Sequence, residues 1–126
     1  AYWDQDKYRE ASKGYKKLLV ISPFDEEALV RLSSYYRQEG REKSAYQVLK
    51  SCYLSGKANP GIQLEYAECA LLLDKVAEGR DVLLDLIEKG DESPRVNFLL
   101  WKIYDNQGKE KVASYYKKLF ERSKAA

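Results

Sequence analysis

The sequence has no histidine, and nothing in it has the pattern of a reaction centre. There is no nucleophile motif and no glycine-rich loop of the kind that cradles phosphate, and the carboxylates are scattered along the chain. A missing histidine does not by itself forbid catalysis, but no other pattern points to it. We therefore expect no catalytic residue, no cofactor and no metal ion, and we expect that the protein is not an enzyme.

Cysteine is also scarce, with only Cys52 and Cys69 in the chain. Two cysteines do not make the dense disulfide framework of a small secreted domain. They lie on neighbouring predicted helices, where buried free thiols are favoured over a disulfide. The compartment stays open, with the cytoplasm favoured over the bacterial envelope or periplasm.

Neither sign of charge dominates, and no apolar run is long. There are 22 Lys and Arg against 20 Asp and Glu, interspersed along the chain. A nucleic-acid partner would call for a clustered basic face, so none is expected. The longest apolar stretch, 67–73, contains Glu68 and is far short of the roughly 20 residues that span a bilayer. The chain starts at Ala1 without a secretion signal, and we expect it to be processed or excised from something longer.

What the sequence does contain is an internal repeat with an offset of 34 residues. One column of this repeat holds small residues: Ala11, Ala45, Gly79 and Ala113. Three more columns are Asp6, Gly40, Asp74 and Gly108; Tyr2, Tyr36, Ala70 and Tyr104; and Leu18, Cys52, Leu86 and Phe120. Agreement over so many positions without a gap predicts a chain built from one repeated structural unit.

Each unit predicts two helices joined by a tight turn. Apolar residues recur at helical spacing, and Gly40 and Gly108 stand where the first helix should end. Asn59-Pro60 and Ser93-Pro94 have the pattern of a cap followed by proline at the first helical position. Helices are expected over 7–21, 26–39, 42–55, 60–73, 76–89, 94–107 and 110–123, and residues 1–5 as the last turn of an earlier helix.

These columns resemble the tetratricopeptide repeat. The residues that carry the resemblance are Tyr8, Ala11, Tyr15, Leu18 and Pro23, then Leu29, Leu32, Tyr36, Gly40, Ala45, Leu49 and Cys52. The resemblance implies an all-α, right-handed superhelical solenoid of antiparallel helical hairpins, with about three and a half repeats. We expect one domain over 1–126, divided into a partial repeat at 1–24, repeats at 25–58 and 59–92, and a divergent terminal repeat at 93–126.

The later repeats depart from the family pattern. Gln63 and Asn97 stand where a large apolar residue is usual, Trp101 replaces a small residue and Lys117 replaces an aromatic one. The last helix makes a better apolar face when it is turned by about one residue. That face would be formed by Val112, Tyr116, Leu119 and Phe120.

The resemblance implies that the first helices of the hairpins line a concave groove that binds a partner protein. The groove positions carry Val30, Ser34, Arg37, Leu64, Glu68, Leu71, Leu72, Phe98, Lys102 and Asp105. An apolar wall with a few mixed charges suits a peptide or helix with apolar anchors. The chain would then be an interaction scaffold or adaptor, although the leucines could instead pack only within the domain.

Other interpretations remain open. The chain could be a structural segment of a longer solenoid or assembly protein, of the bacterial secretion, pilus or flagellar kind, that associates with itself or other subunits through its ends. It could also be the accessory domain of a longer enzyme. Trp3 and Trp101 are candidate interface residues, with core packing favoured for Trp101. A clamp for the carboxylate of chaperone tails is disfavoured, because Glu65 and Glu68 would repel it and only Arg95 has a suitable charge.

Overall fold

The computed structural model describes residues 2–125, and it describes the side chains of residue 7 and residues 9–123. Every regular element in this range is an α-helix. The helices are α1 (Tyr2–Ile21), α2 (Glu26–Gln38), α3 (Glu42–Leu54), α4 (Pro60–Leu72), α5 (Val76–Glu88), α6 (Pro94–Asn106) and α7 (Glu110–Ala125).

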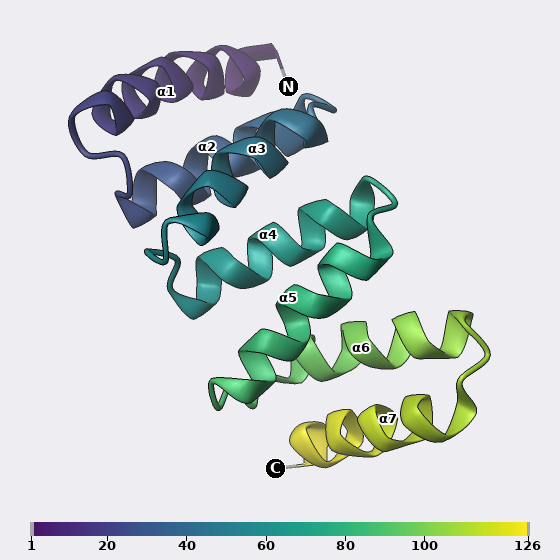
Figure 1. The fold of residues 1–126 in the computed structure, drawn as a ribbon. Coiled ribbons are helices and arrows are strands. Elements are labelled where there is room, and N and C mark those ends of the chain that lie inside the picture. The colour runs from purple at the N-terminus through teal and green to yellow at the C-terminus, as the bar shows by residue number, and fades with distance from the viewer. Residues whose placement is uncertain (1, 126) are drawn as a thin grey trace.

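The helices form a row of antiparallel hairpins in chain order. Figure 1 shows α2 with α3, α4 with α5, and α6 with α7, each hairpin beside the next, with α1 against α2 at one end. Contacts join neighbours along the chain, and the first helices α2 and α4 also touch. The all-α solenoid of helical hairpins predicted from the repeat is therefore confirmed.

Side-chain caps explain why the first helices begin where they do. The Oδ1 atom of Asp25 accepts a hydrogen bond from the backbone N–H of Ala28 at 2.9 Å. Asn59 caps α4 in the same way through the N–H of Ile62 at 2.8 Å. Each cap satisfies an N–H that has no partner within its helix. The predicted ends of α2 to α6 agree with the structure to within one residue.

Left-handed backbone ends the first helix of each hairpin. Gly40 and Gly108 have φ of 72°, a conformation that costs glycine little. The equivalent residue of the middle hairpin is Asp74, with φ of 62°. The turn lets the N–H of Arg41 reach the carbonyl oxygen of Tyr36 at 2.7 Å, which closes the helix end.

The core runs continuously through the row of helices. Its largest fully buried apolar side chains include Leu29, Leu49, Ile62, Leu83 and Leu100. Burial of a leucine or isoleucine side chain contributes about 1.5–3 kcal/mol. No single hairpin covers its apolar faces alone, so this core depends on the stacking of neighbours.

The small-residue column brings paired helices close together. Ala45 and Ala113 are buried, and a Cβ atom added at Gly79 would lie 2.8 Å from Cδ2 of Leu71. Helices α4 and α5 therefore approach too closely there for any side chain without a shift of Leu71. Ala11, in the same column, is exposed on α1.

The prediction for residues 1–5 is wrong for the part that the structure describes. Residues 2–5 belong to α1, which continues without a break to Ile21. The segment has no proline and no glycine before Gly14. Asp6, unlike the glycines of its column, lies within the helix and does not end it.

The last helix, α7, follows the repeat at its small residue, Ala113, but departs from it one helical turn later. Ala113 and Tyr116 are buried, whereas Lys117 is exposed. The predicted one-residue rotation is thus right for Tyr116 and wrong for Val112, which is 40% exposed. Ala113 allows α7 to pack closely on α6, so it holds the start of the helix in register.

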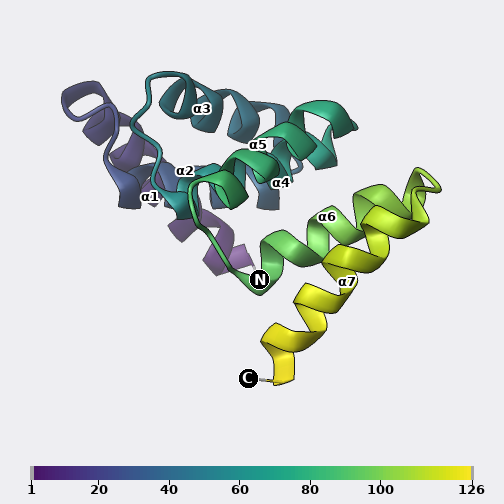
Figure 2. The same ribbon diagram turned by 60° about the horizontal axis from the view of Figure 1, so that its bottom comes forward.

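The last hairpin also packs mainly on itself. Helix α6 contacts α7 much more extensively than it contacts α5. Figure 2 shows α6 and α7 inclined away from α4 and α5. Within the described residues, no helix is both long and apolar enough to cross a membrane.

Candidate partner-binding surface

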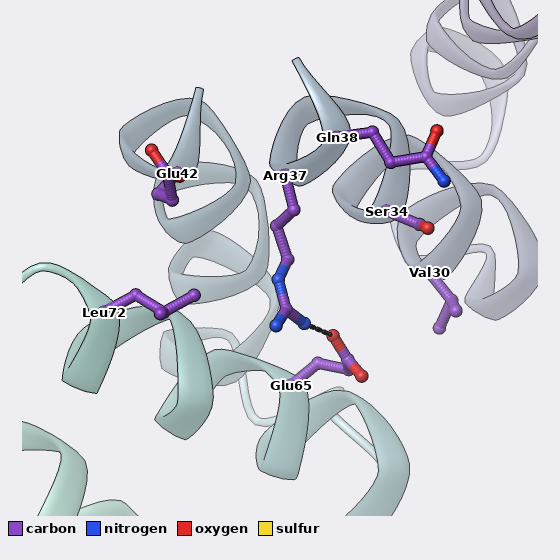
Figure 3. Close-up of a pocket in the computed structure, with 7 residues that line it drawn as sticks. All are labelled: Val30, Ser34, Arg37, Gln38, Glu42, Glu65 and Leu72. Atoms are coloured by element: carbon purple, nitrogen blue, oxygen red, sulfur yellow. Dashed lines mark hydrogen bonds and ion pairs between the residues drawn. The ribbon is translucent and has the colours of Figure 1, made fainter. Parts of the chain in front are cut away.

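A cleft lies between the first helices of two successive hairpins, α2 and α4 (Figure 3). Its volume is about 460 Å³. The lining residues are Val30, Ser34, Arg37, Gln38, Glu42, Glu65 and Leu72. Four of the predicted groove residues, Val30, Ser34, Arg37 and Leu72, therefore lie together.

An ion pair crosses this cleft. Nη1 of Arg37 on α2 donates to Oε2 of Glu65 on α4 at 3.0 Å, and Figure 3 shows the two side chains pointing toward each other. Both side chains are about one third exposed. Because solvent reaches both groups, the pair contributes little to stability. It leaves polar hydrogen-bonding groups on the cleft surface.

Two apolar side chains flank the ion pair and remain open to solvent. Val30 is 37% exposed and Leu72 is 56% exposed. These groups, with the polar pair between them, give the mixture of apolar anchors and orienting charges that a peptide-binding groove needs.

A second cleft of about 460 Å³ lies where α4 and α5 meet α6. It contains two more predicted groove residues, Leu71 and Lys102. All of its lining residues are Leu71, Asp74, Val76, Leu99, Lys102, Ile103, Asn106 and Gln107. The two clefts thus contain six of the ten predicted groove residues.

Between the two clefts, Glu68 is engaged within the chain. Its Oε1 atom accepts a hydrogen bond from Nε of Arg95 on α6 at 2.7 Å, and the Glu68 side chain is 15% exposed. Arg95 also lies over the ring of Phe98. Arg95, the residue of suitable charge for a carboxylate clamp, therefore faces a carboxylate of its own chain.

Phe98 belongs to an aromatic cluster and lines neither cleft. Its ring contacts Trp101 at a centroid distance of 5.8 Å and Phe120 at 5.3 Å. Lys102 lies 4.3 Å from the centroid of the Trp101 ring, and Lys117 lies 5.5 Å from it. These rings are only partly buried. Large aromatic residues thus cover the side of the last hairpin on which Trp101 replaces a small residue.

The remaining predicted residues differ in setting. Leu64 is half-buried, packs against the core and lines neither cleft. Asp105 is exposed on α6 and lines neither cleft. Trp3 lies on α1, but its side chain is outside the described residues.

Gln63, a departure from the repeat pattern, forms a polar network that the sequence did not indicate. Its Nε2 atom donates to the carbonyl oxygen of Val82 at 3.0 Å and to Oδ2 of Asp85 at 2.8 Å. Its Oε1 atom accepts from Lys89 at 3.1 Å, and the hydroxyl of Tyr53 donates to Asp85 at 3.3 Å. Hydrogen bonds from Lys89 and Gln63 lower the pKa of Asp85. The network joins α3, α4 and α5.

A second polar group joins the same three helices. The hydroxyl of Tyr66 on α4 donates to Oε2 of Glu78 on α5 at 2.9 Å, and Lys50 on α3 lies 3.7 Å from the same carboxylate. Burial, followed by the hydrogen bond to Glu78, raises the pKa of Tyr66. Burial acts to raise the pKa of Glu78, but hydrogen bonds from Tyr46 and Tyr66 and the charge of Lys50 lower it overall.

Both cysteines are buried free thiols. Burial raises the pKa of Cys69 to about 11. A thiol of such high pKa is almost wholly protonated at neutral pH and is a poor nucleophile. In the part of the chain that the structure describes, no three His, Cys, Asp or Glu side chains come together as a metal site.

Stacked helical hairpins with an interhelical groove define a helical-repeat protein of the tetratricopeptide type, a class that typically binds other proteins. The sequence family described as "Anaphase-promoting complex, cyclosome, subunit 3" matches residues 4–86, more than half of the chain. The chain belongs to this family, whose repeats are of the same type. Proteins of this repeat type are generally non-catalytic scaffolds. No curated protein matches the sequence.

Proposed function

We propose that the chain is a scaffold that binds a peptide or helical segment of a partner protein along the clefts of α2, α4 and α6. Solvent-exposed apolar side chains beside polar groups are the observation that supports this function. Val30 and Leu72 offer apolar surface on either side of the Arg37–Glu65 pair. Burial of these side chains by a partner would favour association.

The second cleft extends the proposed surface toward the last hairpin. Leu71 supplies apolar contact there and Lys102 supplies a positive charge. A partner segment that follows the first helices could reach both clefts. The first cleft is lined by α2 to α4 and the second by α4 to α6. A partner segment that reaches both clefts would therefore have to be an extended peptide or a helix of several turns.

Substitutions of exposed residues test this proposal without disturbing the core. Val30→Asp combined with Leu72→Asp places charge in the first cleft. Val20 and Leu54 are 83% and 70% exposed and lie in neither cleft, so Val20→Asp with Leu54→Asp is the matched control. Unfolding curves and circular dichroism check that both variants fold.

Affinity capture from lysate, with identification by mass spectrometry, gives the readout. The proposal expects a partner that the wild type and the control double variant retain and that the cleft double variant loses. A partner captured equally by all three chains would refute the cleft assignment. Leu64 and Phe98 are unsuitable for substitution, because both side chains pack within the chain.

End-to-end association is a second candidate, supported by α1. Ala11 is exposed and Leu18 is 38% exposed, whereas the equivalent Ala45 and Cys52 are 0% and 1% exposed. Helix α3 packs against both α2 and α4. Sedimentation velocity of wild type and Leu18→Glu tests this function: a concentration-dependent oligomer lost in the variant supports it, and a monomer at all concentrations contradicts it.

A further inference from the structure

The aromatic cluster of the last hairpin carries two lysine side chains on its rings. Phe98, Trp101 and Phe120 contact one another at centroid distances of 5.3–5.9 Å. Lys102 and Lys117 lie over the Trp101 ring, 4.3 Å and 5.5 Å from its centroid. The three aromatic residues are half-buried and both lysines are exposed. These five residues form a surface of α6 and α7 that we call the basic aromatic patch.

Neither lysine of the patch is neutralised by a neighbouring carboxylate. Among the described residues, no Asp or Glu forms an ion pair with Lys102 or Lys117. In the middle of the chain, by contrast, Lys89 pairs with Asp85 at 2.9 Å. The ammonium groups of the patch are therefore held beside the rings by aromatic contacts alone, and their charge is available to an incoming acidic group.

The hairpin around the patch is the basic part of the chain. Residues 94–126 contain eight Lys and Arg against three Asp and Glu, a net charge of +5. Residues 1–93 contain 14 Lys and Arg against 17 Asp and Glu, a net charge of −3. The three acids of the hairpin, Asp105, Glu110 and Glu121, are exposed. This excess of positive charge favours a negatively charged partner.

Comparison with the preceding repeat shows that the patch departs from the pattern of the fold. The residues 34 positions before Trp101 and Lys117 are Ala67 and Leu83, and both are 0% exposed. The last hairpin thus presents a large ring and a charge where the middle hairpin packs its core. A wholly apolar partner would leave the ammonium group of Lys117 buried without a counter-charge, which is costly. A partner that brings carboxylates avoids this cost.

We propose that the basic aromatic patch binds an acidic segment of a partner protein, in which carboxylates flank an aromatic side chain. The aromatic side chain would pack against the accessible parts of the rings of Phe98, Trp101 and Phe120, and large aromatic residues commonly dominate protein interfaces. The carboxylates would pair with Lys102 and Lys117 and fix the orientation of the segment.

Nucleic acid fits the patch less well, although it is also acidic. Nucleobases bind aromatic residues by stacking on an open ring face. Lys102 and Lys117 lie over the Trp101 ring, so a base could stack beneath them only after they move. A carboxylate needs no such movement, because it binds the ammonium groups where they stand. The repeat type to which the chain belongs also typically binds proteins.

The patch is distinct from the two clefts proposed above. Phe98, Trp101, Lys117 and Phe120 line neither cleft, and only Lys102 also borders the second one. Helix α7, which contributes Lys117 and Phe120, lines neither of them. An acidic segment can therefore bind here whether or not the first cleft is occupied.

Fluorescence of Trp101 tests the proposal directly. The sequence has two tryptophans, so Trp3→Phe leaves Trp101 as the single emitter. The probe is a short peptide with capped ends in which glutamates flank a central phenylalanine. One matched probe has lysines in place of the glutamates, and another has serine in place of the phenylalanine.

We expect a saturable change in Trp101 emission with the acidic aromatic probe, and weaker binding at higher salt. The serine probe should bind more weakly and the lysine probe should not bind. No saturable change with the acidic aromatic probe overturns the proposal. Equal affinity for the lysine probe, or for the serine probe, overturns it too, because the charges or the rings would then take no part.

Two charge variants in the same background locate the binding. Lys102→Gln with Lys117→Gln should weaken binding of the acidic aromatic probe by about fivefold or more. Lys43 and Lys57 are exposed and lie outside the patch and both clefts, so Lys43→Gln with Lys57→Gln is the matched control and should change affinity by less than about twofold. Circular dichroism checks that both fold. Equal losses would mean that binding follows net charge alone, which overturns the assignment.

Two further measurements separate the patch from other ligands and surfaces. A single-stranded oligonucleotide or an anionic lipid vesicle that binds more tightly than the acidic aromatic probe overturns a protein partner. Val30→Asp with Leu72→Asp should retain peptide binding, and loss of binding there would assign the peptide to the first cleft. Failure of the groove experiment with retained peptide binding would count against the groove and not against the patch.

Discussion

The middle hairpin, α4–α5, and the last hairpin, α6–α7, share a backbone pattern but satisfy their buried polar groups differently. Gln63 in α4 has partners for both atoms of its amide, whereas Oδ1 of the equivalent Asn97 in α6 has none. Repetition of a fold therefore does not guarantee repetition of its hydrogen bonds. A buried side-chain amide stabilises the fold only when the neighbouring residues satisfy its hydrogen bonds.

The two hairpins also differ in how they attach to the rest of the chain. The middle hairpin is joined to α3 by polar contacts of Tyr53 and Lys50. The last hairpin holds together largely through aromatic packing, in which Tyr104 stacks on Tyr116 with a centroid distance of 5.8 Å. The middle hairpin is thus integrated into the array, and the last is more self-contained.

The largest expected difference in stability between the two hairpins is at one repeat position, which holds Leu83 in the middle hairpin and Lys117 in the last. Leu83 is 0% exposed and Lys117 is exposed. Leu83→Ala should lower the free energy of unfolding by about 2–5 kcal/mol, because it leaves a cavity. Lys117→Ala should change it by less than about 0.5 kcal/mol. Denaturant unfolding measures both, and equal effects would show that the two hairpins use this position alike.

The amide position should give changes of opposite sign. Asn97→Leu is expected to raise the free energy of unfolding by about 1–2 kcal/mol, because it removes an unsatisfied buried acceptor. Gln63→Leu should lower it by about 1–2 kcal/mol, because several hydrogen bonds are lost. The two variants serve as controls for each other in thermal or denaturant unfolding. Destabilisation by both would break the comparison.

Alkaline pH should affect the stability of α4 in a way that α6 does not share. Cys69 of α4 can lose a proton, whereas the equivalent residue of α6 is Ile103. The thiol has a pKa near 9.0 when unfolded and about 11 when folded. The unfolded chain therefore loses its proton first, and stability present below pH 9 is lost as pH rises toward 11. This group alone should remove about 1 kcal/mol between pH 9 and 10.

Cys69→Ala is the control for the thiol, since it removes this group and leaves the other side chains in place. The fall in unfolding free energy between pH 9 and 10 should be smaller in the variant by about 1 kcal/mol. Identical pH profiles for variant and wild type would mean that the thiol ionises equally in the folded and unfolded chains.

The smallest effect is expected from the ion pair that links the two hairpins. Arg95 is 54% exposed and Glu68 is 15% exposed, so solvent reaches the pair mainly through Arg95. A double-mutant cycle of Arg95→Gln and Glu68→Gln should give a coupling of about 0.5 kcal/mol, reduced further by added salt. A coupling of several kcal/mol would show that the last hairpin depends on this contact.

Much of the fold could be predicted because its signals are local. Asn59-Pro60 and Gly40 mark helix ends through the backbone chemistry of a few adjacent residues, and the structure places the ends there. Residues 2–5 were predicted wrongly: Asp6 shares a repeat column with Gly40 and Gly108 but lies within α1 and does not end it. At Asp74 the same substitution does coincide with a helix end.

The site was less predictable because it depends on contacts between hairpins. Leu64 and Leu72 look alike in sequence, but one packs on the core and the other is 56% exposed. Val30, Leu72 and Lys102 do lie in clefts. Their role in binding a partner stays a proposal. The partners of Gln63 lie 19 to 26 residues away, and the unsatisfied amide could have been suspected only by comparing Asp85 and Lys89 with Leu119 and Ser123.

The close packing of α6 on α7 has a consequence for how readily the last hairpin separates from the rest of the chain. In a linear array, each hairpin contacts only its neighbours, so a hairpin that is weakly attached on one side can separate there without unfolding the others. Helix α6 contacts α5 far less than it contacts α7, so this seam is the easier one to open. Amide protons of α6 and α7 should therefore exchange with solvent as a group, and faster than those of α4 and α5.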